Sequence, residues 1–172
     1  LKLSRSGETV DAIGIDTWGV DFAFVGRDGS LLGLPYAYRD PHTDGAPEEY
    51  FSKVLPKEEV YGDTGIQIMN FNSLYQLYAM QRDHSSQLAA ADRLLFMPDA
   101  LSYLLTGEMV TEYTIASTSQ LLNPRTKRIE ARLLEKMGLS PELFPPIVMP
   151  GHRIGTLRAE LAAACGVPQL PV

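Results

Sequence analysis

Residues 12–25 read AIGIDTWGVDFAFV, and their alternation of apolar and polar positions predicts a β-strand. The turn sequence GRDG follows at 26–29, and SLLGLP at 30–35 resumes an extended apolar pattern. Two such runs joined by a short glycine-containing turn are typical of a hairpin. The hairpin predicts a domain built on a sheet, and the segments after it indicate which kind.

Helical patterns dominate after the hairpin. Residues 36–45, YAYRDPHTDG, contain Pro41 and Gly45 and predict a loop. The helices predicted beyond it cover 47–54, 56–62, 72–83, 85–93, 98–107, 129–138 and 156–166. LLFM at 94–97 predicts a buried strand or an extended connector, and residues 141–155 predict an irregular, proline-rich segment. Residues 108–123 fit either a pair of strands or a strand that runs into a helix. The order of these segments predicts an α/β or α+β fold.

The composition excludes several classes of protein. The 172 residues suffice for one globular domain with its own core, and no apolar run approaches the roughly 20 residues that a membrane span needs. The net charge of −6, with scattered basic residues, argues against nucleic-acid binding. The single cysteine, Cys165, excludes an internal disulfide and fits a reducing cytoplasm. We therefore expect a cytoplasmic protein without a nucleic-acid or membrane partner.

The motifs of several common sites do not occur in the sequence. His42, His84 and His152 lack the spacing of a zinc-binding helix, so no metal site is predicted. The chain has no GxxxxGK[ST] loop, no GxGxxG after a strand and no GxSxG elbow. The common nucleotide, dinucleotide and serine-nucleophile sites are therefore not predicted here.

Three polar clusters remain as candidate sites. The first contains Trp18 beside Gly19, and a flat apolar face next to bare backbone suits a sugar ring, which offers CH patches and hydroxyl groups. The second contains Tyr38, Arg39 and Asp40. A third, Met69–Asn72, precedes a predicted helix. Each cluster also has a purely structural interpretation: a half-buried strand with Trp18 in the core, an Arg-Asp pair that caps a loop, and an asparagine cap beside an aromatic staple.

The order of five segments resembles the FGGY carbohydrate kinases. They read IGIDTWGVDFAFVGRDGSLLGLPYAYRD at 13–40, GDTGIQIMNFNSLYQL at 62–77, MPDALSYLLTG at 97–107, EYTIASTSQLLN at 112–123 and GHRIGTL at 151–157. TWGVDF and GIQIMNFNSLYQL resemble the rhamnulokinase branch of the family in particular. The resemblance runs from about residue 11 to the end of the chain.

The resemblance implies an α/β, ribonuclease H-like (actin-like ATPase) N-terminal kinase domain with a helical insertion. Residues 1–172 would form part of this sugar-binding domain, without its first strands and without the C-terminal domain. In such kinases the opening hairpin and the C-terminal domain handle ATP and Mg²⁺, and the catalytic aspartate lies on a strand that would follow Val172. We therefore expect no catalytic residue and no metal ligand within this chain.

The resemblance also implies contacts with the sugar. After the first strand they fall on Trp18, Gly19 and Val20, and the aromatic residue and acid after the hairpin are Tyr38 and Asp40. Phe71 and Asn72 match a third contact region. The family usually has lysine where Gln76 stands and tryptophan where Ala79 stands. Charged or polar side chains at positions 19 and 20 grip the sugar in related kinases, so the residues here imply a roomier site that suits a 6-deoxy sugar.

The function implied is phosphorylation of L-rhamnulose to L-rhamnulose 1-phosphate by ATP, in rhamnose catabolism. A piece without phosphate cradle and base should be inactive alone. Three alternatives stay open: a kinase for another ketose, a non-catalytic sugar-sensing domain of the same fold, and an actin-like ATPase without a sugar substrate.

Overall fold

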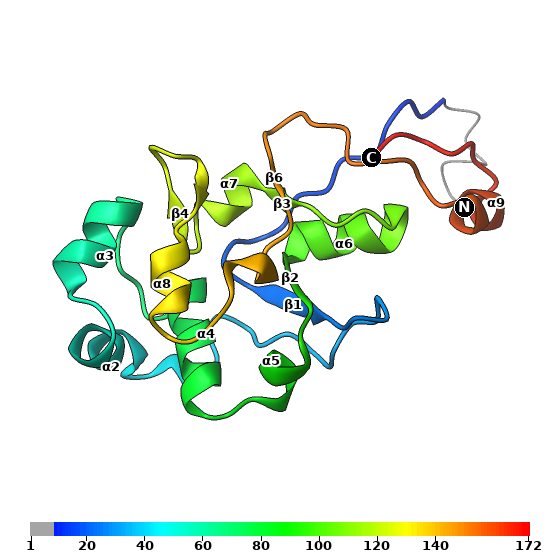
Figure 1. Cartoon of the computed structure of the whole chain (residues 1–172). Helices are drawn as coiled ribbons and strands as arrows, with labels where there is room; N and C mark the ends of the chain where they lie inside the picture. The colour runs from blue at the N-terminus through cyan, green and yellow to red at the C-terminus, as the bar shows by residue number, and fades with distance from the viewer. Residues whose placement is uncertain (1–8) are drawn as a thin grey trace.

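The structure is a computed structural model that describes residues 9–172 (Figure 1). Its strands are β1 Phe22–Val25, β2 Arg93–Phe96, β3 Thr111–Glu112, β4 Leu122–Asn123, β5 Arg128–Ile129 and β6 Ile147–Val148. The α-helices are α2 Ala46–Lys53, α3 Lys57–Thr64, α4 Ser73–Arg82, α5 Ser86–Ala90, α6 Met97–Thr106, α7 Tyr113–Ala116, α8 Ala131–Glu135 and α9 Ala159–Cys165. Two 3₁₀ turns, η1 Pro41–Thr43 and η2 Pro141–Leu143, complete the described elements. The expected α/β class is therefore confirmed.

The antiparallel pair of β1 and β2 lies between two hydrophobic clusters. Successive residues of a strand point to opposite faces of the sheet. Phe22 and Phe24 accordingly join the larger cluster with α2 and α4, whereas Ala23 and Val25 join the smaller one beside α6. Figure 1 shows α6 on one side of this pair and α4 on the other. Helices thus cover both faces of this sheet.

The first strand is much shorter than its sequence pattern predicts. The prediction of a strand over 12–25 is wrong for residues 12–21, because β1 begins only at Phe22. Ile13 N–H donates to the carbonyl of Pro171 (2.9 Å), but residues 12–21 form no strand ladder with any part of 9–172. A sharp turn at Gly19–Asp21 separates the alternating segment from β1. The second limb of the hairpin is reduced to one bridge between Val25 and Leu31.

The helices follow their start and stop signals. Gly45, with φ of 73°, precedes α2, and Gly107, with φ of 88°, ends α6. Positive φ is a conformation that glycine adopts without steric cost. Leu94, Leu95 and Phe96 of the LLFM segment lie in β2, and Met97 begins α6 directly after it. None of the helices in the described part of the chain is long and apolar enough to cross a bilayer.

The alternatives left open for residues 108–123 resolve into a strand that runs into a helix. β3 leads directly into α7, and β4 follows it to form a hairpin with β5. β6, inside the segment predicted to be irregular, pairs with β3 in parallel. In Figure 1, α2 and α3 lie at one end of the molecule and α9 lies at the other. The helices between β1 and β2 correspond to the expected helical insertion.

Candidate functional site

The chain reverses sharply at Gly19–Val20–Asp21. Asp21 N–H donates to the Gly19 carbonyl (2.9 Å), and Val20 has a φ of +69°. A bond between residues two apart around a central residue of positive φ is a γ-turn of the rare, strained type. A β-branched residue in this conformation is a genuine outlier. We call these three residues the Gly19–Asp21 turn.

Three side chains hold this turn through the backbone of Val20. Val20 N–H donates to Thr118 Oγ1 (3.1 Å). The Val20 carbonyl accepts hydrogen bonds from Ser73 Oγ (2.6 Å) and Gln76 Nε2 (3.2 Å). Ser73 and Gln76 are buried in α4, and Thr118 follows α7. Both backbone polar groups of Val20 are therefore bonded to side chains from segments remote in sequence.

Gly19 is required by its surroundings. A Cβ atom at this position would lie 2.9 Å from Thr118 Oγ1, which is closer than real Cβ atoms approach other atoms, and 3.0 Å from Thr118 Cγ2. The Gly19 carbonyl accepts the bond that closes the turn, whereas Gly19 N–H donates to no residue within 9–172. The turn thus presents one backbone donor without a partner in the described chain.

Trp18 lies at the surface beside this turn. Its side chain is 55% exposed, which rejects the structural interpretation of Trp18 as a core residue. The indole Nε1 donates to Asp21 Oδ2 (2.7 Å), and Asp21 is buried. This bond fixes one edge of the ring, so Trp18 offers an apolar surface in a defined orientation.

The aromatic residues of the other two clusters meet each other. The rings of Tyr38 and Phe71 pack edge to face, with centroids 5.5 Å apart. Arg39 lies over the Tyr38 ring at 5.1 Å and donates from Nε to the Tyr38 hydroxyl (2.8 Å). Gln76 Nε2 donates to the Phe71 carbonyl (2.9 Å) as well as to that of Val20. Gln76 therefore connects the Tyr38–Phe71 pair to the Gly19–Asp21 turn.

Asp40 and Asn72 both have structural roles in this conformation. Asp40 Oδ1 accepts from the backbone N–H of His42 (2.9 Å) and caps η1. Asn72 is buried, and its Nδ2 donates to the Gln67 carbonyl (3.0 Å) and to Gln120 Oε1 (2.7 Å). Asn72 precedes α4 but its side chain makes no capping bond. Asp40 stays partly accessible, whereas Asn72 supports the segment that carries Phe71.

Sequence reasoning missed the three residues that hold the turn, Ser73, Gln76 and Thr118. They lie inside two of the quoted segments, NFNSLYQL and ASTSQLL, and Gln76 stands out as a departure from the family pattern. A local helical pattern gives no signal of these contacts with Val20, which join residues 53, 56 and 98 positions apart along the chain. Only the fold brings them to Val20.

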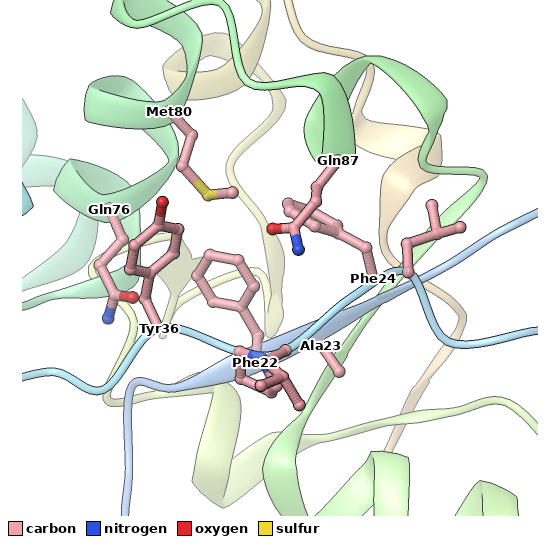
Figure 2. Close-up of a pocket in the computed structure, with 10 residues that line it drawn as sticks. Phe22, Ala23, Phe24, Tyr36, Gln76, Met80 and Gln87 are labelled. Carbon is pink, nitrogen blue, oxygen red and sulfur yellow. The ribbon is translucent and has the colours of Figure 1, made fainter.

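Figure 2 shows a crevice that Gln76 lines. Its volume is about 10 Å³, and none of the predicted site residues lines it. Phe22, Tyr36 and Met80 surround it together with the Gln76 side chain. A space of this size holds at most one water molecule. The crevice is therefore a packing gap between α4 and the loop after β1 rather than a sugar site.

A larger cavity of about 260 Å³ lies at the start of α6 and is lined by Asp16, Asp99 and Glu112 among others. Burial raises the pKa of Asp99 to about 7; the Glu112 backbone N–H opposes the rise, and the charge of the Glu112 side chain adds to it. Both Asp99 carboxyl oxygens lie 3.2 Å from Glu112 N.

Residues 9–172 contain no group of three or more acidic, histidine or cysteine side chains that could hold a metal ion.

Comparisons with known proteins show the family to which this chain belongs. The sequence matches the N-terminal domain of the FGGY family of carbohydrate kinases over residues 2–172. The chain belongs to this family. Among curated relatives, it is similar to the rhamnulokinase of Bacteroides thetaiotaomicron, with 60% identity over 100% of this chain and 36% of the relative. The rhamnulokinase of Enterococcus faecalis is 47% identical over 91% of this chain and 31% of the relative.

Solved structures of sugar kinases share the fold. Gluconate kinase from Lactobacillus acidophilus superposes with a TM-score of 0.89 at 19% identity, covering 99% of this chain and 35% of that one. Glycerol kinase from Plasmodium falciparum gives 0.80 at 16% identity, covering 99% and 35%. These similarities confirm the predicted actin-like, ribonuclease H-like N-terminal kinase domain. The chain spans about a third of the length of the relatives and structures that it matches.

Proposed function

We propose that the parent protein is a rhamnulokinase, which transfers a phosphoryl group from ATP to the 1-hydroxyl of L-rhamnulose. In this proposal residues 1–172 form part of its N-terminal, sugar-binding domain. The names of the relatives, at up to 60% identity, support the choice of sugar. The observation that carries the site is the exposed Trp18 next to the N–H of Gly19, which donates to no residue within 9–172.

The proposed sugar lies against Trp18 and Gly19. An indole face suits the CH patches of a sugar, and a backbone N–H that has no partner within residues 9–172 suits one of its hydroxyl oxygens. Val20 adds no polar side chain here, which leaves room for the methyl group of a 6-deoxy sugar. Tyr38 and Phe71 provide a second apolar surface, and Asp40 accepts a hydrogen bond from a hydroxyl. Asn72 does not contact the sugar in this proposal; its buried amide supports the segment that carries Phe71.

The proposed cofactors are ATP and Mg²⁺. Residues 9–172 contain no group of three or more acidic, histidine or cysteine side chains that could hold a metal ion. By resemblance to the family, we assign the phosphates and the metal to parts of the parent protein outside this chain, together with the base that takes the proton of the attacking hydroxyl. The contribution of this chain is to bind and orient the sugar. We also propose that the parent is cytoplasmic.

A substrate comparison on the complete parent protein tests this function. ATP-dependent phosphorylation is measured by ADP release with L-rhamnulose, L-xylulose, D-xylulose, L-ribulose and D-fructose. We expect the highest kcat/KM for L-rhamnulose. A clear preference for another ketose would refute the proposed substrate. If the protein binds L-rhamnulose but phosphorylates none of the sugars, it is a sugar sensor instead.

The site itself is tested by substitution at Trp18. Trp18→Ala removes the apolar face and should raise KM for L-rhamnulose by about tenfold or more, in line with the loss of one large aromatic contact. Tyr61, another exposed aromatic residue, lies on α3, and Tyr61→Ala is the matched control. Equal effects of the two substitutions would contradict the proposed site.

A further inference from the structure

We propose that Ser73, Gln76 and Thr118 are positioning residues that set the affinity for the sugar by holding the Gly19–Asp21 turn in its strained form. This inference rests on the proposed function, because the turn carries Gly19 and lies next to Trp18. Ser73 and Gln76 are buried and Thr118 is half-buried. We therefore assign them an action on the sugar through Val20 rather than by direct contact.

The first step of the argument is the conformation of Val20. A β-branched residue at a φ of +69° is unfavourable by itself, so it persists only where its surroundings enforce it. Here the enforcement is visible: Thr118 accepts from the Val20 N–H, and Ser73 and Gln76 donate to its carbonyl. Strained backbone that is over-determined in this way is concentrated at functional sites.

The second step is the double role of Gln76. Its Nε2 donates to the Val20 carbonyl (3.2 Å) and to the Phe71 carbonyl (2.9 Å). One side-chain amide thus fixes the spacing between the two halves of the proposed site, Trp18–Gly19 on one side and Tyr38–Phe71 on the other. A side chain without this amide would leave both carbonyls without the donor that joins them.

The third step is the fit between Thr118 and Gly19. The Thr118 side chain fills the space that a Cβ at position 19 would need. The same residue therefore holds the turn by accepting from Val20 and excludes any side chain from position 19. Because position 19 carries no side chain, none can cover the backbone N–H of this residue.

The test uses the complete parent enzyme with near-isosteric substitutions. Thr118→Val removes the acceptor and keeps the shape, whereas Thr118→Ser keeps the hydroxyl. We expect Thr118→Val to raise KM for L-rhamnulose by about tenfold, because it removes the part-buried bonds of the Thr118 hydroxyl to the Val20 N–H and to the Ile115 carbonyl, and Thr118→Ser to stay within about threefold of the wild type. KM for ATP should be unchanged in both variants, because the proposed defect lies in the sugar half of the site.

A second pair of variants covers the case in which Thr118→Val does not fold. Gln76→Met removes the amide that joins Val20 to Phe71, and Gln81→Met is the control at an exposed position of the same helix. Gln76→Met should raise KM for the sugar without raising KM for ATP, and Gln81→Met should change neither. A general structural role would instead lower the amount of active enzyme and leave both KM values as they are, which would overturn the proposal.

Hydrogen exchange separates this inference from the proposed function. The Val20 amide should exchange at least about tenfold faster in Thr118→Val than in the wild type and return to slow exchange in Thr118→Ser. Unchanged exchange would show that Thr118 does not hold the turn. If the wild-type parent phosphorylates no sugar, the proposed function fails first. The positioning role then fails with it, even if hydrogen exchange shows that Thr118 holds the Gly19–Asp21 turn.

Discussion

At the scale of single residues, the backbone strain of Val20 is opposed by the free energy that its hydrogen bonds contribute. A β-branched residue at positive φ costs about 1–3 kcal/mol. Each of the three side-chain hydrogen bonds to its backbone contributes about 0.5–1.5 kcal/mol net, so together they can offset the strain. No single bond suffices at the upper end of that range. The turn is therefore sensitive to the loss of any of the three partners.

The contact between Gly19 and Thr118 gives a prediction about coupling. Gly19→Ala should lower the free energy of unfolding of the parent protein by about 1–3 kcal/mol, because the new methyl group overlaps the Thr118 side chain. Thr118→Ala removes the two nearest atoms, so the double variant should lose less stability than the sum of the single variants. Urea denaturation measures all three.

Gly14 provides the control for this cycle. A Cβ at Gly14 would meet no atom within 4 Å, so Gly14→Ala should change stability by less than about 0.5 kcal/mol. Strict additivity of Gly19→Ala and Thr118→Ala would show that the two positions do not clash.

Asp99 gives a prediction about pH. Its pKa of about 7 in the folded protein is above the value of 3.8 for an unperturbed carboxyl, so the folded state holds the proton more tightly than the unfolded state. Stability should therefore fall as pH rises from about 4 to about 7, by at most about 1.4 kcal/mol per pH unit from this group, and level off above. Asp99→Asn, which cannot ionise, should lose this dependence.

The measurement for Asp99 is the difference in unfolding midpoint between Asp99→Asn and the wild type across pH 4 to 8. The difference should shift in favour of Asp99→Asn as pH rises through the window. Glu108→Gln, at an exposed position just after α6, is the control and should give a nearly constant difference. A constant difference for Asp99→Asn as well would contradict the raised pKa.

At the scale of elements, helices that are far apart in the sequence are joined by a few polar contacts between side chains and backbone or between charged side chains. The Tyr50 hydroxyl of α2 donates to the carbonyl of Leu133 in α8 (3.1 Å), and the Tyr50 side chain is fully buried. Arg132 at the start of α8 pairs with Glu59 and Asp63 of α3. The Tyr50 bond is shielded from water, whereas the ion pairs are partly exposed and contribute little.

Tyr50→Phe should therefore lower the free energy of unfolding by about 1–2 kcal/mol, because it leaves the buried Leu133 carbonyl without its donor. Tyr61→Phe, on the exposed face of α3, should have almost no effect. Urea denaturation of both variants decides the point. A loss for Tyr50→Phe no larger than that for Tyr61→Phe would show that the buried bond contributes nothing.

The elements also show what the sequence could predict. Helices with strong local signals, such as α2, which follows Gly45, and α6, which has Pro98 in its first turn and ends at Gly107, agree with their predicted positions within a few residues. The strand over 12–21 was predicted wrongly, because alternation describes side chains but not whether a partner strand exists for the backbone. The contacts of Gln76 and Thr118 depend on tertiary structure, and no local pattern encodes them.

At the scale of the whole molecule, the described chain contains the proposed sugar surface and no metal cluster within residues 9–172. It spans about a third of the curated relatives. Binding the sugar and transferring the phosphoryl group are thus proposed to belong to different parts of the parent protein.

The isolated 172-residue chain should accordingly release no ADP from ATP in the presence of L-rhamnulose, because it is proposed to lack both the phosphate-binding groups and the base. The complete parent at equal molar concentration is the positive control in the same assay. Measurable turnover by the isolated chain, above that of the Trp18→Ala variant, would disprove the assignment of catalysis to other parts.

Trp18 also has a consequence for spectroscopy. It is the sole tryptophan of this chain, the residue is more than half exposed, and its Nε1 donates a hydrogen bond to the carboxylate of the buried Asp21. Indole emission shifts to shorter wavelength when water around the ring is displaced, so a sugar that covers this face would turn it into an intrinsic optical probe. Light emitted by the chain on excitation of its one indole would then report directly on whether the proposed binding surface is occupied, without a label.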